Sequence, residues 1–153
     1  MVKGFRASAV AADIKGKGDG RLDMAAIVAD AGASAAGVFT RNAAAAAPVH
    51  LCRERLRSGM ATAVLVNSGN ANCMTGTAGK EDAVRLCRGL GKRLDIPETT
   101  VLPCSTGVIG VRLPVARMES SLNSLVRGLS SKGLGDVSRA ILTTDTVPKT
   151  TVR

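Results

Sequence analysis

Runs of apolar residues along the chain predict several short β-strands. The clearest run covers residues 60–67, where alanine, valine and leucine lead to a polar Asn-Ser-Gly-Asn segment. Shorter runs lie at residues 22–29, 35–40 and 101–104. Apolar runs of this length that end at turn-forming residues are typical of strands buried in a sheet. The pattern therefore predicts a sheet with four candidate strands.

Apolar residues recur at helical spacing in two longer segments, residues 78–94 and 114–129, and Pro114 suits a first helical turn. Their apolar positions are Ala83, Leu86, Cys87, Leu90 and Leu94, followed by Met118, Leu122, Leu125 and Leu129. An alanine run at 43–47 also has high helix propensity, but it is short and ends at Pro48. The sequence predicts two amphipathic helices.

Glycines mark the expected connections. The Gly-Lys-Gly-Asp-Gly run at residues 16–20 predicts a hairpin-like turn, because its order matches neither the Walker nor the dinucleotide-binding pattern. Gly89 and Gly91 are expected to weaken the end of the first helix. Gly133 and Gly135 predict a loop after the second helix.

The composition indicates an aliphatic core. Hydrophobic residues make up 45% of the chain, yet it has two Phe and no Tyr or Trp. Small aliphatic side chains bury less area than aromatic ones, so the chain suits closely packed layers and a partner that adds stability. Because strands and helices alternate without a linker or repeat, residues 1–153 are expected to form a single domain of the α/β (layered α+β) class.

The chain carries a formal charge of +9, from 21 Lys and Arg against 12 Asp and Glu. These basic residues are scattered, and aromatic side chains that stack on bases are nearly absent. Both features argue against nucleic-acid binding. An anionic small-molecule substrate or an acidic subunit fits the charge equally well.

The cysteine pattern and the hydropathy bear on metal binding and location. No Cys-x-x-Cys pair occurs, and His50 with Cys52 supplies only two ligands, so no metal site is predicted. The N-terminus lacks the apolar segment of a signal peptide, and no run approaches the roughly 20 apolar residues of a membrane helix. The sequence therefore predicts a cytoplasmic protein with reduced thiols and no membrane contact.

Two polar segments are candidates for chemistry. Residues 105–110 (Ser-Thr-Gly-Val-Ile-Gly) follow a predicted strand, and a hydroxyl beside an accessible backbone N–H can stabilise an oxyanion. On these residues alone a structural turn is the stronger interpretation. The asparagine-rich segment 67–72 is most simply a set of turn caps. His50, the single histidine, has no partner in a recognisable nucleophile motif.

Several segments in this order and spacing resemble the ornithine acetyltransferase family, also called glutamate N-acetyltransferase. The most specific are Val-Asn-Ser-Gly-Asn-Ala-Asn at 66–72 and Ser-Thr-Gly-Val-Ile-Gly at 105–110. The others are Gly-Phe-Arg-Ala at 4–7, Ala-Ala-Gly-Val-Phe-Thr at 35–40, Ala-Ala-Pro-Val at 46–49 and Thr-Thr-Asp-Thr-Val-Pro-Lys at 143–149. The resemblance covers almost the whole chain, which is identified as the N-terminal (α) part of such a protein.

The resemblance implies an acyltransferase of arginine biosynthesis. Family members move an acetyl group from N-acetylornithine to glutamate through an acetyl-enzyme, and some also accept acetyl-CoA. Their precursor cleaves itself before a threonine, which becomes the nucleophile at the N-terminus of a β chain, with its own α-amine as the base. The implied fold is the ornithine acetyltransferase (DmpA-like) fold, with layers like those of N-terminal-nucleophile hydrolases. The implied assembly is α2β2, without metal or cofactor.

Four residues of this sequence match functional positions of the family. The Thr106 hydroxyl and the Gly107 backbone N–H would form the oxyanion hole. Thr143, with Thr144 as second choice, would contact the amino-acid substrate. The nucleophile, a substrate-binding lysine and the β-chain ligands would lie C-terminal to this sequence. The chain by itself is therefore expected to be inactive.

Three alternatives stay open at this point: an inactive fragment, a scaffold or binding module, and the α-like chain of a related self-cleaving aminopeptidase. A Lys-Gly-x-Gly segment and an Ala-Thr junction downstream in the encoding DNA would favour the transferase. A stop codon directly after Arg153 would favour a non-enzymatic role.

The isolated 153-residue chain is expected to fold poorly, because its core lacks aromatic residues and a partner is expected to complete it. Thermal unfolding and size-exclusion chromatography of the isolated chain test this expectation. A cooperative transition at a monomeric elution volume would contradict it.

Overall fold

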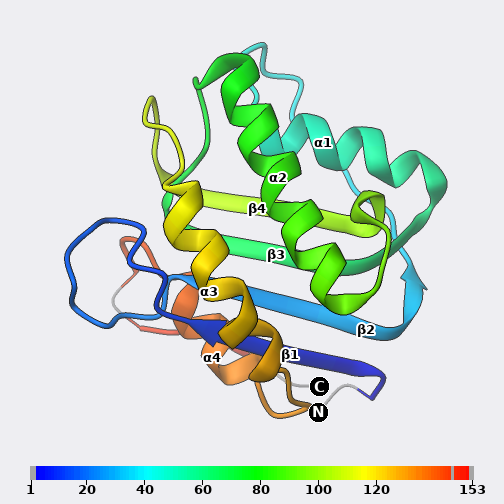
Figure 1. Ribbon diagram of the computed structural model, residues 1–153. Helices are drawn as coiled ribbons and strands as arrows, with labels where there is room; N and C mark the ends of the chain where they lie inside the picture. The colour runs from blue at the N-terminus through cyan, green and yellow to red at the C-terminus, as the bar shows by residue number, and fades with distance from the viewer. Residues whose placement is uncertain (1–2, 146, 152–153) are drawn as a thin grey trace.

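A four-stranded sheet forms the centre of the computed structural model, which describes residues 3–145 and 147–151 (Figure 1). The strands are β1 (Phe5–Val10), β2 (Met24–Ser34), β3 (Met60–Asn70) and β4 (Val101–Val108). They lie in the order β1-β2-β3-β4. The first two pairings are antiparallel and the β3–β4 pairing is parallel.

Helices lie on both faces of this sheet (Figure 1). Their bounds are α1 (Ala47–Arg55), α2 (Gly76–Leu94), α3 (Val115–Arg127) and α4 (Leu134–Ala140), and two short 3-10 helices cover Leu56–Ser58 and Glu98–Thr100. Helix α2 connects β3 to β4, as a parallel pairing requires a crossover. Helices α2 and α3 cover one face, and α4 packs on β1 and β2 from the other.

The apolar side chains of β2 alternate between the two faces of the sheet and so contribute to two hydrophobic clusters. Ala26 and Val28 belong to the larger cluster with α2 and α3, whereas Ala25 and Ile27 pack in the cluster that includes Val137 of α4. Successive side chains of a strand point to opposite faces, so one apolar run can serve two layers. The expected aliphatic core is confirmed.

The strongest sequence patterns match the structure closely. The predicted helices at 78–94 and 114–129 correspond to α2 and α3, and the run at 60–67 lies within β3. Gly89 and Gly91 lie inside α2, which continues to Leu94. A Cβ atom at Gly89 would lie 2.8 Å from Cδ1 of Leu122, so this glycine allows α3 to approach α2 closely.

The predicted strand at 35–40 is wrong, because this segment has no strand partner among the residues that the structure describes. The β2–β3 pairing ends where Ser34 meets Met60, the first residue of β3. The segment beyond it is irregular, and Val38 is fully exposed. An apolar run without a neighbouring strand leaves its backbone groups unpaired and does not form a sheet.

Two further expectations near helix ends are corrected. The alanine run at 43–47 has high helix propensity, yet its first four residues are not helical; α1 begins at Ala47 and has Pro48 in its first turn, where a missing N–H costs nothing. The loop expected around Gly133 and Gly135 is shorter than predicted, because Gly135 lies inside α4. Within the described residues, no helix is long and apolar enough to span a membrane.

Replacing Leu122 by alanine is expected to lower the free energy of unfolding by about 3 kcal/mol, because its side chain is fully buried between α3 and α2. Urea denaturation of the full-length gene product measures this change. Ser124→Ala, at an exposed position of the same helix, is the matched control and should change the value by less than about 0.5 kcal/mol. Equal effects would show that Leu122 does not hold the two helices together.

Candidate functional site

The two motifs that the sequence singles out lie side by side at the carboxyl ends of β3 and β4. In the parallel register Asn67 pairs with Ser105, Ser68 with Thr106 and Gly69 with Gly107. Residues 105–107 are therefore part of β4, and the turn expected there is wrong. The pairing continues beyond the strands, since the Ala71 N–H donates to the Val108 carbonyl over 2.8 Å.

Two glycines allow the strand ends to come this close. Gly107 has a φ of 133°, and a Cβ atom there would lie 2.4 Å from the carbonyl carbon of Gly69. Gly69 itself has a φ of 97°. L-residues with side chains rarely adopt either conformation, and the contact leaves no room for one at Gly107.

The Thr106 side chain lies on the face of the sheet that α4 partly covers. Val66 packs in the α4 cluster, so Ser68, two residues on, points to the same face. Thr106 pairs with Ser68 and shares that face. Thr106 is half-buried and Gly107 is exposed. Because β4 is an edge strand, its other side has no strand partner within the described residues.

A network of hydrogen bonds from buried asparagine side chains holds the ends of β3 and β4 in place. The Asn67 amide donates to the Asn70 carbonyl over 2.8 Å, and the Ser105 hydroxyl donates to the Asn67 side-chain oxygen over 2.7 Å. The Asn70 amide donates to the carbonyls of Val111 and Arg112, each over 3.1 Å. A bond of the predicted turn-cap kind runs from the Asn72 N–H to the Asn70 side-chain oxygen over 2.8 Å, although residues 67–70 belong to β3. The remaining bonds link both motifs.

The same network reaches helix α2. The Asn72 amide donates to the Gly79 carbonyl over 2.8 Å, and the Thr75 hydroxyl donates to the Asn72 side-chain oxygen over 2.9 Å. Asn72 is fully buried. Among the described residues, every buried side-chain nitrogen and oxygen has a hydrogen-bond partner. A fully satisfied polar network of this kind holds the site rigidly.

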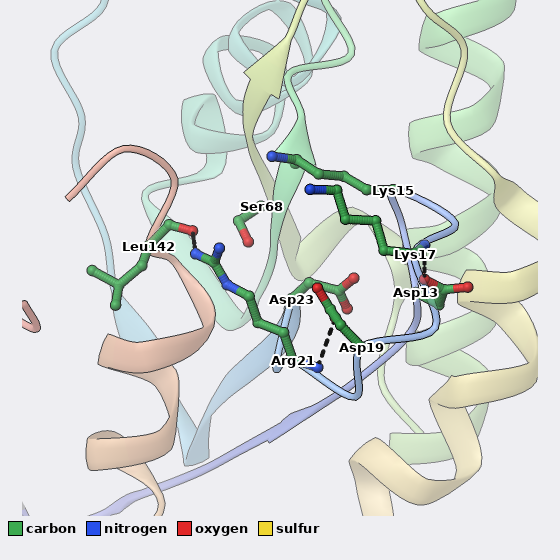
Figure 2. Close-up of a pocket in the computed structure, with 9 residues that line it drawn as sticks. Asp13, Lys15, Lys17, Asp19, Arg21, Asp23, Ser68 and Leu142 are labelled. Carbon is green, nitrogen blue, oxygen red and sulfur yellow. Dashed lines mark hydrogen bonds between the residues drawn. The ribbon is translucent and has the colours of Figure 1, made fainter. Parts of the chain in front are cut away.

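A small cleft of about 40 Å³ borders this end of the sheet (Figure 2). Ser68 and Gly69 of β3 line it on one side, and Leu142, after α4, lines it on another. The Arg21 guanidinium donates to the Leu142 carbonyl and so fixes the segment that leads to Thr143. The cleft therefore separates the strand ends from the threonine segment.

The four predicted site residues are brought to one end of the molecule, in two groups. Thr106 and Gly107 end β4, whereas Thr143, half-buried, and Thr144, exposed, follow the cleft-lining Leu142. Within the described residues, no hydrogen bond joins the two groups. The loop 11–23, where the glycines predict a hairpin-like turn, connects the antiparallel strands β1 and β2 and also lines the cleft.

The thiols near the site are poor nucleophiles. Burial raises the pKa of Cys52 from 9.0 to about 11, with a smaller contribution from Cys104, so its thiol stays protonated at neutral pH. Burial also raises the pKa of Cys87. Cys104 is exposed and is bonded to no basic group in the described part of the chain. No group of three or more potential metal ligands occurs there either.

The layered sheet-and-helix fold of this domain is shared with solved structures of ArgJ and ornithine acetyltransferase proteins. The sequence signature of the ArgJ family matches residues 6–153. The chain therefore belongs to the ArgJ family.

Curated relatives share this family. The arginine biosynthesis bifunctional protein ArgJ of Geobacter sulfurreducens is 52% identical over 152 residues, which are 99% of this chain and 38% of the relative. The protein of the same name from Symbiobacterium thermophilum is 44% identical over 146 residues, or 95% of this chain and 36% of the relative. The chain thus spans little more than a third of these relatives and matches their N-terminal part.

Solved structures agree with the fold expected from the resemblance. The arginine biosynthesis bifunctional protein ArgJ of Bacillus halodurans superposes with a TM-score of 0.86 at 38% identity, over 95% of this chain and 75% of that one. The ornithine acetyltransferase of Mycobacterium tuberculosis, complexed with ornithine, superposes with a TM-score of 0.89 at 37% identity, over 95% and 78% of the two chains.

Replacing Gly107 by alanine is expected to separate the ends of β3 and β4, because the new Cβ atom would meet the Gly69 backbone. Hydrogen exchange of the amides at residues 67–72 in the full-length gene product should become at least tenfold faster. Gly135→Ala in α4, where a Cβ atom meets nothing within 4 Å, is the control and should leave exchange unchanged. Unchanged exchange in Gly107→Ala would refute the close-packing role.

Proposed function

We propose that this chain is the α-chain portion of a glutamate N-acetyltransferase, which moves the acetyl group of N-acetylornithine to glutamate in arginine biosynthesis. The observation that carries the proposal is the Thr106–Gly107 strand end, held in place by Gly69 and the buried asparagines. Membership of the ArgJ family and the likeness to an ornithine acetyltransferase structure support it.

The proposed chemistry is a ping-pong acyl transfer. A threonine hydroxyl from the β part attacks the acetyl carbonyl carbon, and the carbonyl oxygen becomes an oxyanion. The Thr106 hydroxyl and the Gly107 N–H stabilise that charge, the ornithine α-amine leaves with the proton, and an acetyl-enzyme remains. The glutamate α-amine then attacks the acetyl-enzyme through a second oxyanion at the same two donors. The bond from the acetyl carbon to the threonine oxygen breaks, the threonine oxygen takes the amine proton, and N-acetylglutamate leaves. No metal or cofactor takes part in this sequence.

Thr143 and Thr144 are proposed to contact the amino-acid substrate. Their position supports this role, since they follow Leu142, which lines the cleft beside Ser68 and Gly69. The bond from Arg21 to the Leu142 carbonyl holds the segment against the cleft. A substrate whose acetyl group lies at Thr106 would extend toward these threonines.

The partner proposed for this domain is the β chain cut from the same precursor, in an α2β2 assembly in the cytoplasm. The edge strand β4 and the apolar side chains after it support this proposal, because Val108, Ile109 and Val111 are all more than half exposed. By itself the domain lacks the nucleophile and is proposed to be inactive. Acetyl-CoA is a second proposed donor, in keeping with relatives that are named bifunctional.

Replacing Thr106 by alanine is expected to lower acetyl transfer from N-acetylornithine to glutamate by two or more orders of magnitude, because one oxyanion donor is lost. The assay uses the full-length gene product and measures kcat. Thr106→Ser keeps the hydroxyl and should retain most of the activity. Self-cleavage is followed by gel electrophoresis in each variant, so that failed maturation is separated from failed catalysis.

Two results would contradict the proposal. Wild-type protein that cleaves itself but hydrolyses peptides instead of transferring acetyl groups would identify an aminopeptidase. Wild-type protein without either activity would identify a scaffold or binding module.

A further inference from the structure

The loop 11–23 between β1 and β2 is a rigid wall of the cleft, held by carboxylates. Asp23 accepts the backbone N–H groups of Ala12 and Ile14, each over 2.7 Å, and both of these residues are buried. The backbone that leads into Lys15 is therefore held in place at the preceding residue, Ile14. A loop with such anchors can hold a side chain in a defined place, unlike a freely solvated turn.

The other carboxylates of the loop are also engaged within it. Asp13 accepts the N–H groups of Lys17 over 2.7 Å and of Gly18 over 3.0 Å, and Arg117 of α3 donates to its carboxylate and carbonyl. The Gly18 N–H is the main reason that the pKa of Asp13 lies below its ordinary value. Asp19 accepts the Arg21 N–H over 3.1 Å.

The ammonium groups of Lys15 and Lys17, by contrast, have no hydrogen-bond or ion-pair partner among residues 3–145 and 147–151. Figure 2 shows the two side chains extending in the same direction from the loop, over the side of the cleft where Ser68 lies. Asp13, Asp19 and Asp23 balance Lys15, Lys17 and Arg21 in formal charge around the cleft. The carboxylates bond to other groups, however, so the two ammonium groups are available to an anionic ligand.

Lys15 is also placed next to the proposed oxyanion hole. A Cβ atom at Gly69 would lie 3.1 Å from Cγ and 3.2 Å from Cε of Lys15, so the lysine chain lies across this glycine. Gly69 pairs directly with Gly107 in the neighbouring strand. Strands in a sheet are about 4.8 Å apart, so Lys15 lies against the residue that directly neighbours Gly107.

We propose that Lys15, assisted by Lys17, binds the α-carboxylate of the amino-acid substrate while the acyl group lies at Thr106 and Gly107. This inference rests on the proposed function and adds a substrate-recognition site to it. In an N-acetylated amino acid only three bonds separate the acetyl carbonyl carbon from the α-carboxylate carbon, so the two are less than about 4 Å apart. A lysine whose side chain lies across Gly69, the partner of Gly107, is placed to reach a carboxylate this close to the acyl group.

The α-carboxylate fits this position better than the γ-carboxylate of glutamate does. The γ-carboxylate lies several bonds farther from the acyl group and is absent from N-acetylornithine. An α-carboxylate is common to donor and acceptor, which must use one site in turn in a ping-pong reaction. Recognition of the shared group would therefore place each substrate with its α-nitrogen at the same point.

The test compares Lys15→Met and Lys17→Met with Lys92→Met in the full-length gene product. Methionine keeps most of the side-chain length over Gly69 but removes the charge, and Lys92 is an exposed lysine on α2. For Lys15→Met, kcat/KM should fall about 10- to 100-fold for N-acetylornithine and for glutamate alike, with a smaller fall for Lys17→Met. Lys92→Met should match wild type.

A substrate analogue distinguishes recognition from a structural effect. Wild-type protein should discriminate against the α-carboxamide of N-acetylornithine by about 10- to 100-fold, and Lys15→Met should lose most of that discrimination. Retained discrimination in Lys15→Met, or a loss confined to glutamate, would overturn the α-carboxylate assignment. Unchanged kcat/KM in both variants would show that the two lysines are merely solvated.

A binding measurement that needs no acetyl transfer tests the proposed carboxylate site independently of the proposed transferase activity. Isothermal titration of N-acetylornithine measures the Kd in wild type and in Lys15→Met even if no acetyl group is transferred. A Kd that is at least tenfold weaker in Lys15→Met supports the carboxylate site when the transferase activity is absent. An equal Kd overturns the site when the transferase activity is present.

Discussion

The close parallel pairing of β3 with β4 is the constraint on which the rest of the site depends. Gly69 and Gly107 approach so closely that a side chain at Gly107 would overlap the neighbouring backbone. This contact brings the Asn-Ser-Gly and Ser-Thr-Gly segments together, although α2 separates them in the sequence. A slip of one residue would move Thr106 to the opposite face of the sheet. Glycine at both positions therefore fixes where the proposed oxyanion donors lie.

Hydrogen bonds from polar side chains make the paired ends of β3 and β4 rigid. Asn67, Asn70 and Asn72 are buried, and each bonds to backbone or side-chain atoms of another segment. Leaving any of these groups unpaired in the interior would cost about 1–3 kcal/mol, so the arrangement resists distortion. The small aliphatic residues of the sheet contribute little directional packing. The asparagine network supplies the directionality that such a core lacks.

The two faces of the sheet are covered unequally by helices. One face is covered by α2 and α3 and holds the larger core, whereas α4 covers only the β1–β2 side of the other. Thr106 and the exposed Cys104 lie on the less covered side of β4. The cleft with Lys15 lies beside this open region. An excess of basic residues suits a protein whose proposed substrates are carboxylates.

The sequence by itself determined the elements whose pattern is local, and the family. The helices at 78–94 and 114–129 and the strand at 60–67 were predictable because each carries its full periodicity within the segment. Segment 35–40 was as apolar as a true strand, and only the absence of a partner beyond Ser34 decided its irregular form. The adjacency of residues 67–72 to 105–108 and the position of Lys15 across Gly69 were likewise decided by tertiary structure. The physical reason is that strand pairing and side-chain placement depend on contacts between distant segments, which no local pattern encodes.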